Sequence, residues 1–131
     1  MRAIIILIQC FFVFNSLQSQ TMGQGVKFMS YNIRLDHAGD AENNWHHRKV
    51  DMIGYIEEIA PDFMGIQEGM VGQVNYLNQN LPNYDFIGVG RDDGIEAGEF
   101  SAIYYRSADW KLVKAETFWL SPTPEKPGLG W

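Results

Sequence analysis

The stretch Pro61-Asp62-Phe63-Met64-Gly65-Ile66-Gln67-Glu68 decides how this sequence folds, because it ends one element and begins another. Proline cannot continue a helix, so Pro61 stops the element that precedes it. The residues after it form a short, mainly apolar run, which predicts a buried strand over 62–68. Apolar residues at three- and four-residue spacing come before it and predict an amphipathic helix over 46–60 (Val50, Ile53, Ile56, Ala60).

The alternation of strand and helix extends in both directions. Residues 26–32 carry apolar or aromatic side chains on both faces, which predicts a strand buried from two sides. A loop over 33–45 follows, since that segment is rich in Gly, Asp and Asn. Beyond Glu68, apolar spacing predicts a second helix, which Pro82 ends (Val71, Val74, Leu77, Leu81).

Three more strands are expected after the second helix, over 84–89, 100–105 and 110–120. The polar residues 106–109 would join the last two as a hairpin. The resulting order predicts an α/β domain with a mixed sheet and helices packed against it. The Pro- and Gly-rich end, 121–131, leads to no further element, so we expect the domain to be incomplete in this chain.

Composition excludes several classes of protein. The 131 residues include one cysteine, so neither an intrachain disulfide nor a cysteine-based zinc site can form. The aromatic content of 14% argues against disorder. The formal charge is −6, and it becomes −7 without Arg2, the only charged residue among the first twenty. Because polyanions are bound by Lys and Arg, we expect no stable complex with nucleic acid.

The N-terminus has the layout of a secretory signal peptide over residues 1–20: Arg2, an apolar run and a polar stretch. The apolar run is shorter than the roughly 20 residues of a membrane-spanning helix, which disfavours an uncleaved anchor. Lipidation at Cys10 is disfavoured because Gln9 precedes it. We expect cleavage near Gln20 and a mature domain over 21–131. It would be secreted, periplasmic or in the cell envelope, with membrane contact only through the signal segment.

Two polar residues, Asn32 and Glu68, each stand where a predicted buried strand ends. The carboxyl ends of strands are where α/β folds build their sites. Glu68 offers a hard oxygen ligand for Mg²⁺ or Mn²⁺, and Asn32 can donate a hydrogen bond to a phosphate oxygen. From the residues alone, a second interpretation remains open: Asn32 forms a turn and Glu68 is solvated.

Four motifs resemble those of the endonuclease/exonuclease/phosphatase superfamily, which has the DNase I-like fold. They are Ser30-Tyr31-Asn32-Ile33-Arg34, then Trp45 and Arg48 at the start of the first helix, then 61–68, and finally 98–106. The most specific feature is the pairing of a strand that ends in Ser-Tyr-Asn with a later Pro-Asp-x-x-x-x-Gln-Glu strand.

The resemblance implies a four-layer sandwich, in which two mixed sheets pack face to face and are flanked by helices. It also implies a Mg²⁺-dependent (or Mn²⁺-dependent) phosphoesterase, in which water attacks phosphorus in line. Glu68 would then be a metal ligand, and Asn32 would help to hold the metal and its phosphate. Arg91 and Glu99 flank the loop before 100–105 and would reach the same cleft, where Arg91 can bind phosphate. Their alternative interpretation is a turn residue and a surface ion pair.

Departures from the family pattern limit what is carried over. Abasic-site nucleases of the superfamily have an Asp two residues after the strand-end Asn, where this chain has Arg34. Members also carry an Asp-x-Asn pair and a Ser-Asp-His segment in their second half, and neither is present here. The resemblance therefore covers the N-terminal half of a domain, and this chain alone is expected to be inactive.

Three interpretations follow. The first is a phosphoesterase that cleaves a phosphodiester or phosphomonoester of unidentified structure. The second is a non-catalytic secreted binding module on the same fold, and the third is an inactive truncated gene product. The sequence does not distinguish oligomeric states.

Overall fold

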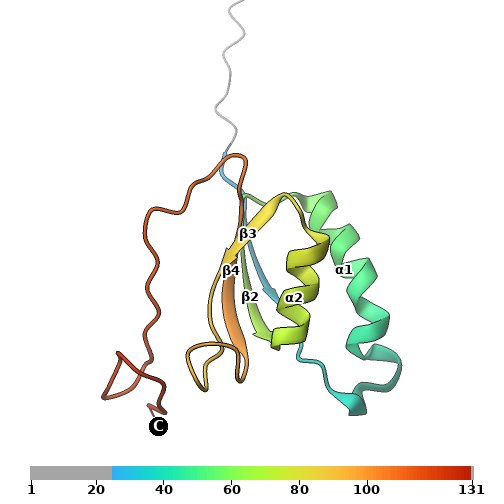
Figure 1. Cartoon of the computed structure of the whole chain (residues 1–131). Helices are drawn as coiled ribbons and strands as arrows, with labels where there is room; N and C mark the ends of the chain where they lie inside the picture. Colours follow the sequence, from blue (N-terminus) through green and yellow to red (C-terminus); the bar gives the residue numbers. More distant parts are fainter. Residues whose placement is uncertain (1–24, 131) are drawn as a thin grey trace, which may run out of the picture.

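The computed structural model describes residues 25–130, and the predicted signal segment over 1–20 lies outside them (Figure 1). The described chain forms a mixed α/β unit, as the sequence predicts. Its elements are β1 (Phe28–Asn32), the short 3-10 helix η1 (Ala38–Asn43), α1 (Trp45–Ile59), β2 (Phe63–Gly69), α2 (Val71–Asn80), β3 (Tyr84–Ile87) and β4 (Phe100–Arg106). Among these residues, none of the helices is both long and apolar enough to cross a membrane.

Prolines and capping side chains set the ends of the helices. Asn44 caps α1, since its side-chain oxygen accepts the N–H of His47. Ala60 ends the helix in the left-handed conformation (φ 45°), directly before Pro61. The sequence-based bounds of both helices are confirmed to within a residue or two.

The strands form one mixed sheet in the order β1-β2-β4-β3. β1 and β2 are parallel and are connected through α1, whereas β4 runs antiparallel to both of its neighbours. The C-terminal ends of β1 and β2 therefore lie at the same end of the sheet.

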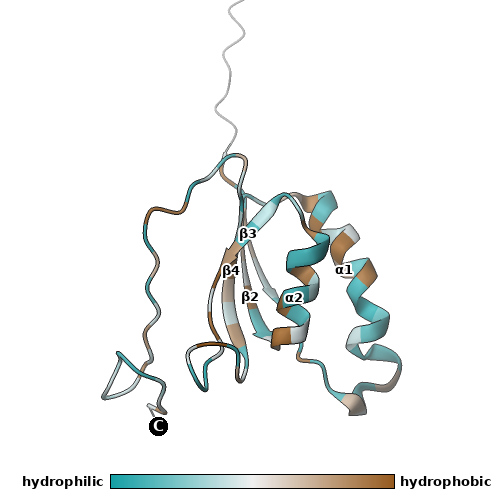
Figure 2. Cartoon of the chain, in the orientation of Figure 1, coloured by the Kyte–Doolittle hydropathy of each residue, from teal (hydrophilic) through white to brown (hydrophobic). Residues whose placement is uncertain are grey.

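Both helices pack on the same face of this sheet and bury it (Figure 1). Figure 2 shows hydrophobic and hydrophilic residues alternating along each helix, which is the pattern of helices that are half in contact with a core. Side chains of α1, α2 and alternate strand positions meet there. The most deeply buried hydrophobic residues are Ile33, Ile56, Met64, Ile66, Val74, Leu77, Leu81, Ala102 and Tyr104.

The opposite face of the sheet is open in residues 25–130. Phe28 is 75% exposed and Ile103 is 46% exposed, and Phe28 stacks on Phe63 with ring centroids 5.2 Å apart. The expectation that 26–32 is buried from two sides is therefore wrong for this part of the chain. The physical reason is that both helices cover one face of the sheet, so that only alternate residues of β1 reach the core.

The predicted strand over 110–120 is also wrong, and so is its hairpin with the preceding strand. β4 lies between β2 and β3, so both of its edges already carry hydrogen-bonded neighbours. A hairpin partner would need one of those edges. Residues 110–120 instead run as an extended, mostly exposed segment. Trp119 anchors its far end, since its indole N–H donates to the carbonyl of Arg91 at 2.7 Å.

Candidate functional site

The ends of the two parallel strands bring Asn32 and Glu68 into contact. In the β1–β2 register Asn32 lies opposite Gln67, so Glu68 is the next residue along. The side-chain amide of Asn32 donates through Nδ2 to Glu68 Oε1 at 2.7 Å. The two residues selected from the sequence thus form one hydrogen-bonded pair.

A bulge in β2 sets the direction of Glu68. The pairing of β2 with β4 shifts between Ile66 and Gly69, where β2 contains one residue more than β4. Glu68 lies within this irregularity and has a positive φ of 62°. Such a conformation is costly for a residue with a side chain, and bulges are a common means of redirecting a side chain. The bulge takes Glu68 out of the regular ladder and leaves it half-buried at the end of the sheet.

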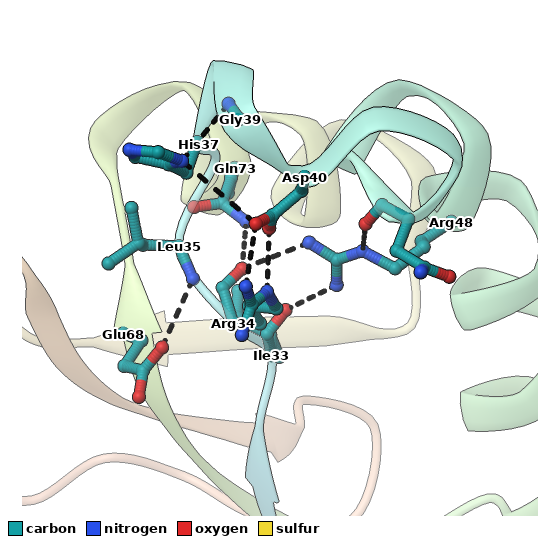
Figure 3. A network of polar contacts seen from close by, with 10 residues as sticks. Ile33, Arg34, Leu35, His37, Gly39, Asp40, Arg48, Glu68 and Gln73 are labelled. Carbon is teal, nitrogen blue, oxygen red and sulfur yellow. Dashed lines mark hydrogen bonds and ion pairs between the residues drawn. The ribbon is translucent and has the colours of Figure 1, made fainter.

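The backbone that follows β1 completes the surroundings of both side chains. The N–H of Arg34 donates to Asn32 Oδ1 at 2.9 Å, and the N–H of Leu35 donates to Glu68 Oε2 at 3.3 Å. Figure 3 shows the second of these bonds. Each Glu68 carboxylate oxygen therefore accepts one hydrogen bond and keeps further lone pairs for a ligand.

These donors lower the pKa of Glu68. The largest cause is the hydrogen bond from Asn32, followed by the N–H of Leu35, while partial burial opposes them and the charge of Arg34 adds a smaller effect. Donors to a carboxylate favour its charged form. Glu68 is therefore an ionised carboxylate at neutral pH, which is the form that binds a divalent cation.

Next to this pair, Arg34 forms a two-pronged ion pair with Asp40. Its Nε and Nη2 each lie 2.6 Å from a carboxylate oxygen of Asp40. The Asp40 side chain is only 6% exposed, whereas that of Arg34 is 61% exposed. The hydrogen bonds from Arg34 are the main reason that the pKa of Asp40 is lowered. A cation thus stands at the position where abasic-site nucleases carry an acid.

Arg91 and Glu99 lie at the same end of the sheet as Glu68. Gly90 forms an isolated antiparallel β-bridge with Phe100, and Phe100 in turn pairs with Gly69, the residue after Glu68. Arg91 and Glu99 form an ion pair, with Arg91 Nη1 3.1 Å from Glu99 Oε2. In the part of the chain described, neither makes a hydrogen bond or ion pair with Asn32 or Glu68.

The residues fit a divalent cation through one carboxylate. Within 25–130 there is no cluster of three His, Cys, Asp or Glu side chains that could hold a metal ion. Mg²⁺ does not need such a cluster, because it commonly keeps several waters and binds through one or two carboxylates together with a substrate phosphate. An ionised, half-buried Glu68 with free lone pairs meets that requirement.

Sequence analysis missed two residues that hold this site together, Arg48 and Gln73. In the sequence Arg48 stands out only as part of a motif, and none of the patterns considered above points to Gln73. Gln73 does carry a recognisable signal, since it stands four residues before Leu77 and therefore on the buried face of the second helix.

Solved structures with the same arrangement identify the family. An endonuclease/exonuclease/phosphatase from Bacteroides vulgatus matches with a TM-score of 0.78 and 39% identity, over 81% of this chain and 41% of its own. The mannosyl-6-phosphatase of Bacteroides thetaiotaomicron VPI-5482 matches with a TM-score of 0.79 and 38% identity, over 82% and 41%. A further endonuclease/exonuclease/phosphatase family protein from B. thetaiotaomicron gives 0.78 and 38%, over 81% and 38%.

No family model matches the sequence, and no curated protein matches it either. On the structural likeness, the chain belongs to the endonuclease/exonuclease/phosphatase superfamily. Its mixed sheet and two helices form part of a DNase I-like fold, so the sequence-based family and fold class are confirmed. The chain spans about two fifths of the length of these structures.

Proposed function

We propose that residues 25–130 carry the metal-binding half of a phosphoesterase site. The observation that supports this most directly is the Asn32–Glu68 hydrogen bond at the ends of adjacent parallel strands. This bond orients the ionised carboxylate at the end of the sheet, where a cation can reach it. The superfamily membership supports hydrolysis of a phosphate ester as the reaction.

In this proposal Glu68 holds Mg²⁺ or Mn²⁺, and Asn32 keeps the carboxylate oriented. The bound ion would supply Lewis-acid stabilisation of the charge that develops on the phosphoryl oxygens. The Nδ2 group of Asn32 has a second hydrogen, which is available to donate to a phosphate oxygen. Its Oδ1 accepts the N–H of Arg34, which favours Asn32 as a phosphate contact over Asn32 as a second metal ligand.

The substrate proposed for the first assay is a sugar phosphomonoester. The likeness to a protein named as a mannosyl-6-phosphatase supports this choice. Arg91 at the same end of the sheet is a further candidate for binding the phosphate.

We also propose that turnover requires residues other than 25–130. Residues 25–130 hold no cluster of three His, Cys, Asp or Glu side chains around Glu68, and His37 lies against Asp40, with Nδ1 3.9 Å from Oδ1. His46 and His47 lie exposed on α1. Residues 25–130 alone should therefore bind metal weakly and hydrolyse no ester. Location outside the cytoplasm, through residues 1–20, is part of the same proposal.

The test compares Glu68→Gln with the exposed control Glu58→Gln in the full-length protein. We expect Mg²⁺-dependent release of phosphate from mannose 6-phosphate, its loss with EDTA, and at least a ~100-fold lower kcat/KM in Glu68→Gln, since metal stabilisation amounts to several kcal/mol. Glu58→Gln should match the wild type. Bis-p-nitrophenyl phosphate tests the diester alternative. Unchanged turnover in Glu68→Gln would exclude this residue from the mechanism.

The binding-module alternative has its own outcome in the same experiment. It predicts a folded full-length protein that hydrolyses neither ester at any Mg²⁺ or Mn²⁺ concentration. That result would indicate a protein that keeps the fold but does not catalyse hydrolysis, and the site would then be interpreted as a ligand-binding surface.

A further inference from the structure

Gln73 is a buried polar side chain whose hydrogen bonds leave α2 and reach the loop after β1. It is 1% exposed. Its Oε1 accepts the N–H of Met70 and the N–H of Asp36, both at 3.0 Å. Its Nε2 donates to the carbonyl of Arg34 at 2.9 Å. Burying an amide is costly unless its donors and acceptors are paired, and these three bonds pair it.

Arg48, on α1, donates hydrogen bonds to the same loop. Its Nη1 donates to the carbonyl of Ile33 at 2.7 Å, and its Nη2 donates to the carbonyl of Arg34 at 3.2 Å. The guanidinium also lies 5.8 Å from the ring of Trp45, which supports its position. The Arg34 carbonyl therefore receives donors from both helices, as Figure 3 shows.

The loop needs such support because Arg34 has a positive φ of 55°. The left-handed conformation is costly for a residue with a side chain and persists where the surroundings enforce it. Here side chains from two helices donate hydrogen bonds to its carbonyl and hold it in place. This conformation directs the N–H groups of Arg34 and Leu35 to Asn32 and Glu68.

We propose that Gln73, assisted by Arg48, is a positioning residue for the Asn32–Glu68 pair. Neither side chain touches the pair directly; both act through the backbone of residues 33–36. This inference rests on the proposed function, since it assigns a role toward the same cation and phosphate.

A purely structural role for Gln73 makes a different prediction. If Gln73 only capped α2, the bond from the Met70 N–H to its Oε1 would be sufficient. Gln73→Glu keeps an oxygen at that place but puts a second oxygen where Nε2 faces the Arg34 carbonyl. The cap and the bond from the Asp36 N–H are then retained, while the donation to the Arg34 carbonyl is lost. Gln73→Met removes all three.

The experiment uses the full-length protein with Gln73→Glu, Gln73→Met and the matched controls Gln79→Glu and Gln79→Met, because Gln79 lies exposed on the same helix. The three measurements are Mn²⁺ affinity by electron paramagnetic resonance, hydrogen exchange of the Arg34 and Leu35 amides, and kcat and KM for mannose 6-phosphate. Residues that orient metal ligands typically change affinity 10- to 100-fold when they are replaced.

We expect Gln73→Glu to weaken Mn²⁺ binding about 10-fold or more, to speed exchange of both amides and to lower kcat more than it raises KM. The controls should match the wild type. Wild-type Mn²⁺ affinity and amide protection in Gln73→Glu would overturn the inference.

Arg48→Lys provides a second variant in case Gln73→Glu does not fold. It keeps the charge but loses the two-pronged donation to the loop. It should change the same two amides in the same direction, and unchanged amide exchange would also overturn the inference. If the wild type shows no turnover, the proposed function fails, while the exchange of the two amides still decides whether Gln73 and Arg48 hold the loop.

Discussion

Asn32 Nδ2 lies 2.7 Å from Glu68 Oε1 although 36 positions of sequence separate the two residues. The parallel register of β1 and β2 places Asn32 opposite Gln67, and the bulge in β2 then presents the Glu68 side chain. The pair is therefore a product of strand pairing, and each partner sets the chemistry of the other. Its properties can be tested without any substrate.

The first prediction concerns the ionisation of Glu68. Asn32→Ala removes the largest cause of its lowered pKa, so the carboxylate should take up a proton at a higher pH than in the wild type. Carboxylate NMR of the metal-free protein during an acid titration would measure this shift. Asn43→Ala, in an exposed part of η1, is the control. Identical titration of Glu68 in Asn32→Ala would show that the hydrogen bond does not govern its charge.

The second prediction concerns acid stability and Asp62, at the opposite end of the sheet. The N–H of Lys27 and the side chain of Arg106 lower the pKa of Asp62 from 3.8 to about 2, with a smaller effect from Trp110. Because the folded-state pKa is the lower one, the stabilisation is present above pH 3.8 and is lost as the pH falls toward 2.

Asp62→Asn should therefore flatten the dependence of Tm on pH in that acid window, while lowering Tm at pH 7. Thermal unfolding followed by circular dichroism at a series of pH values measures both effects. Asp85→Asn, an exposed residue on β3, serves as the control. If the wild type and Asp62→Asn lose stability in parallel below pH 3.8, the assignment to Asp62 is wrong.

The third prediction concerns the core between α2 and the sheet. Leu77 is fully buried, so Leu77→Ala leaves a cavity and should lower the free energy of unfolding by about 2–5 kcal/mol. Leu120→Ala makes the same chemical change at a residue that is 77% exposed, and it should alter stability by less than about 0.5 kcal/mol. Urea unfolding of the two variants provides the comparison. Equal effects would contradict the placement of the core.

The fourth prediction is a stabilising substitution. Ala60 ends α1 with φ 45° and ψ 61°, a conformation that glycine adopts without the steric cost. Ala60→Gly should raise the free energy of unfolding by roughly 0.5–1 kcal/mol, because relief of the strain exceeds the added flexibility of the unfolded chain. Gly54→Ala, in the middle of the same helix, should stabilise through helix propensity. A lower Tm in Ala60→Gly would count against the left-handed conformation.

Local patterns predicted most of the fold. Pro61 and Pro82 mark helix ends because the proline ring excludes helix continuation, and the spacing of Leu77 and its neighbours marks the buried face of α2. These signals act over a few residues. Asn32 and Glu68 could be chosen as candidates from the same kind of signal, since each stands at a strand end.

What failed depended on strand order. The segment 110–120 has strand-like composition, but as the hairpin partner of β4 it would need an edge of β4, and both of those edges are already used. The sequence pattern predicts that Phe28 is buried, yet its exposure depends on which face of the sheet the helices cover. The positive φ of Glu68 and the hydrogen bond from Gln73 to the Arg34 carbonyl both arise from packing between distant segments. No short-range sequence pattern encodes such packing.

The position of β4 also governs when the sheet can form during synthesis. Among residues 25–130, β4 is the last strand in sequence order but lies inside the sheet, where it supplies a neighbour to β2 and the only pairing of β3. A nascent polypeptide that has emerged only as far as Ile87 can pair β1 with β2, yet it leaves β3 unpaired. Until Arg106 leaves the ribosome, one edge of β2 stays available to other chains, so elongation through 88–106 is the interval in which a chaperone would have most to protect.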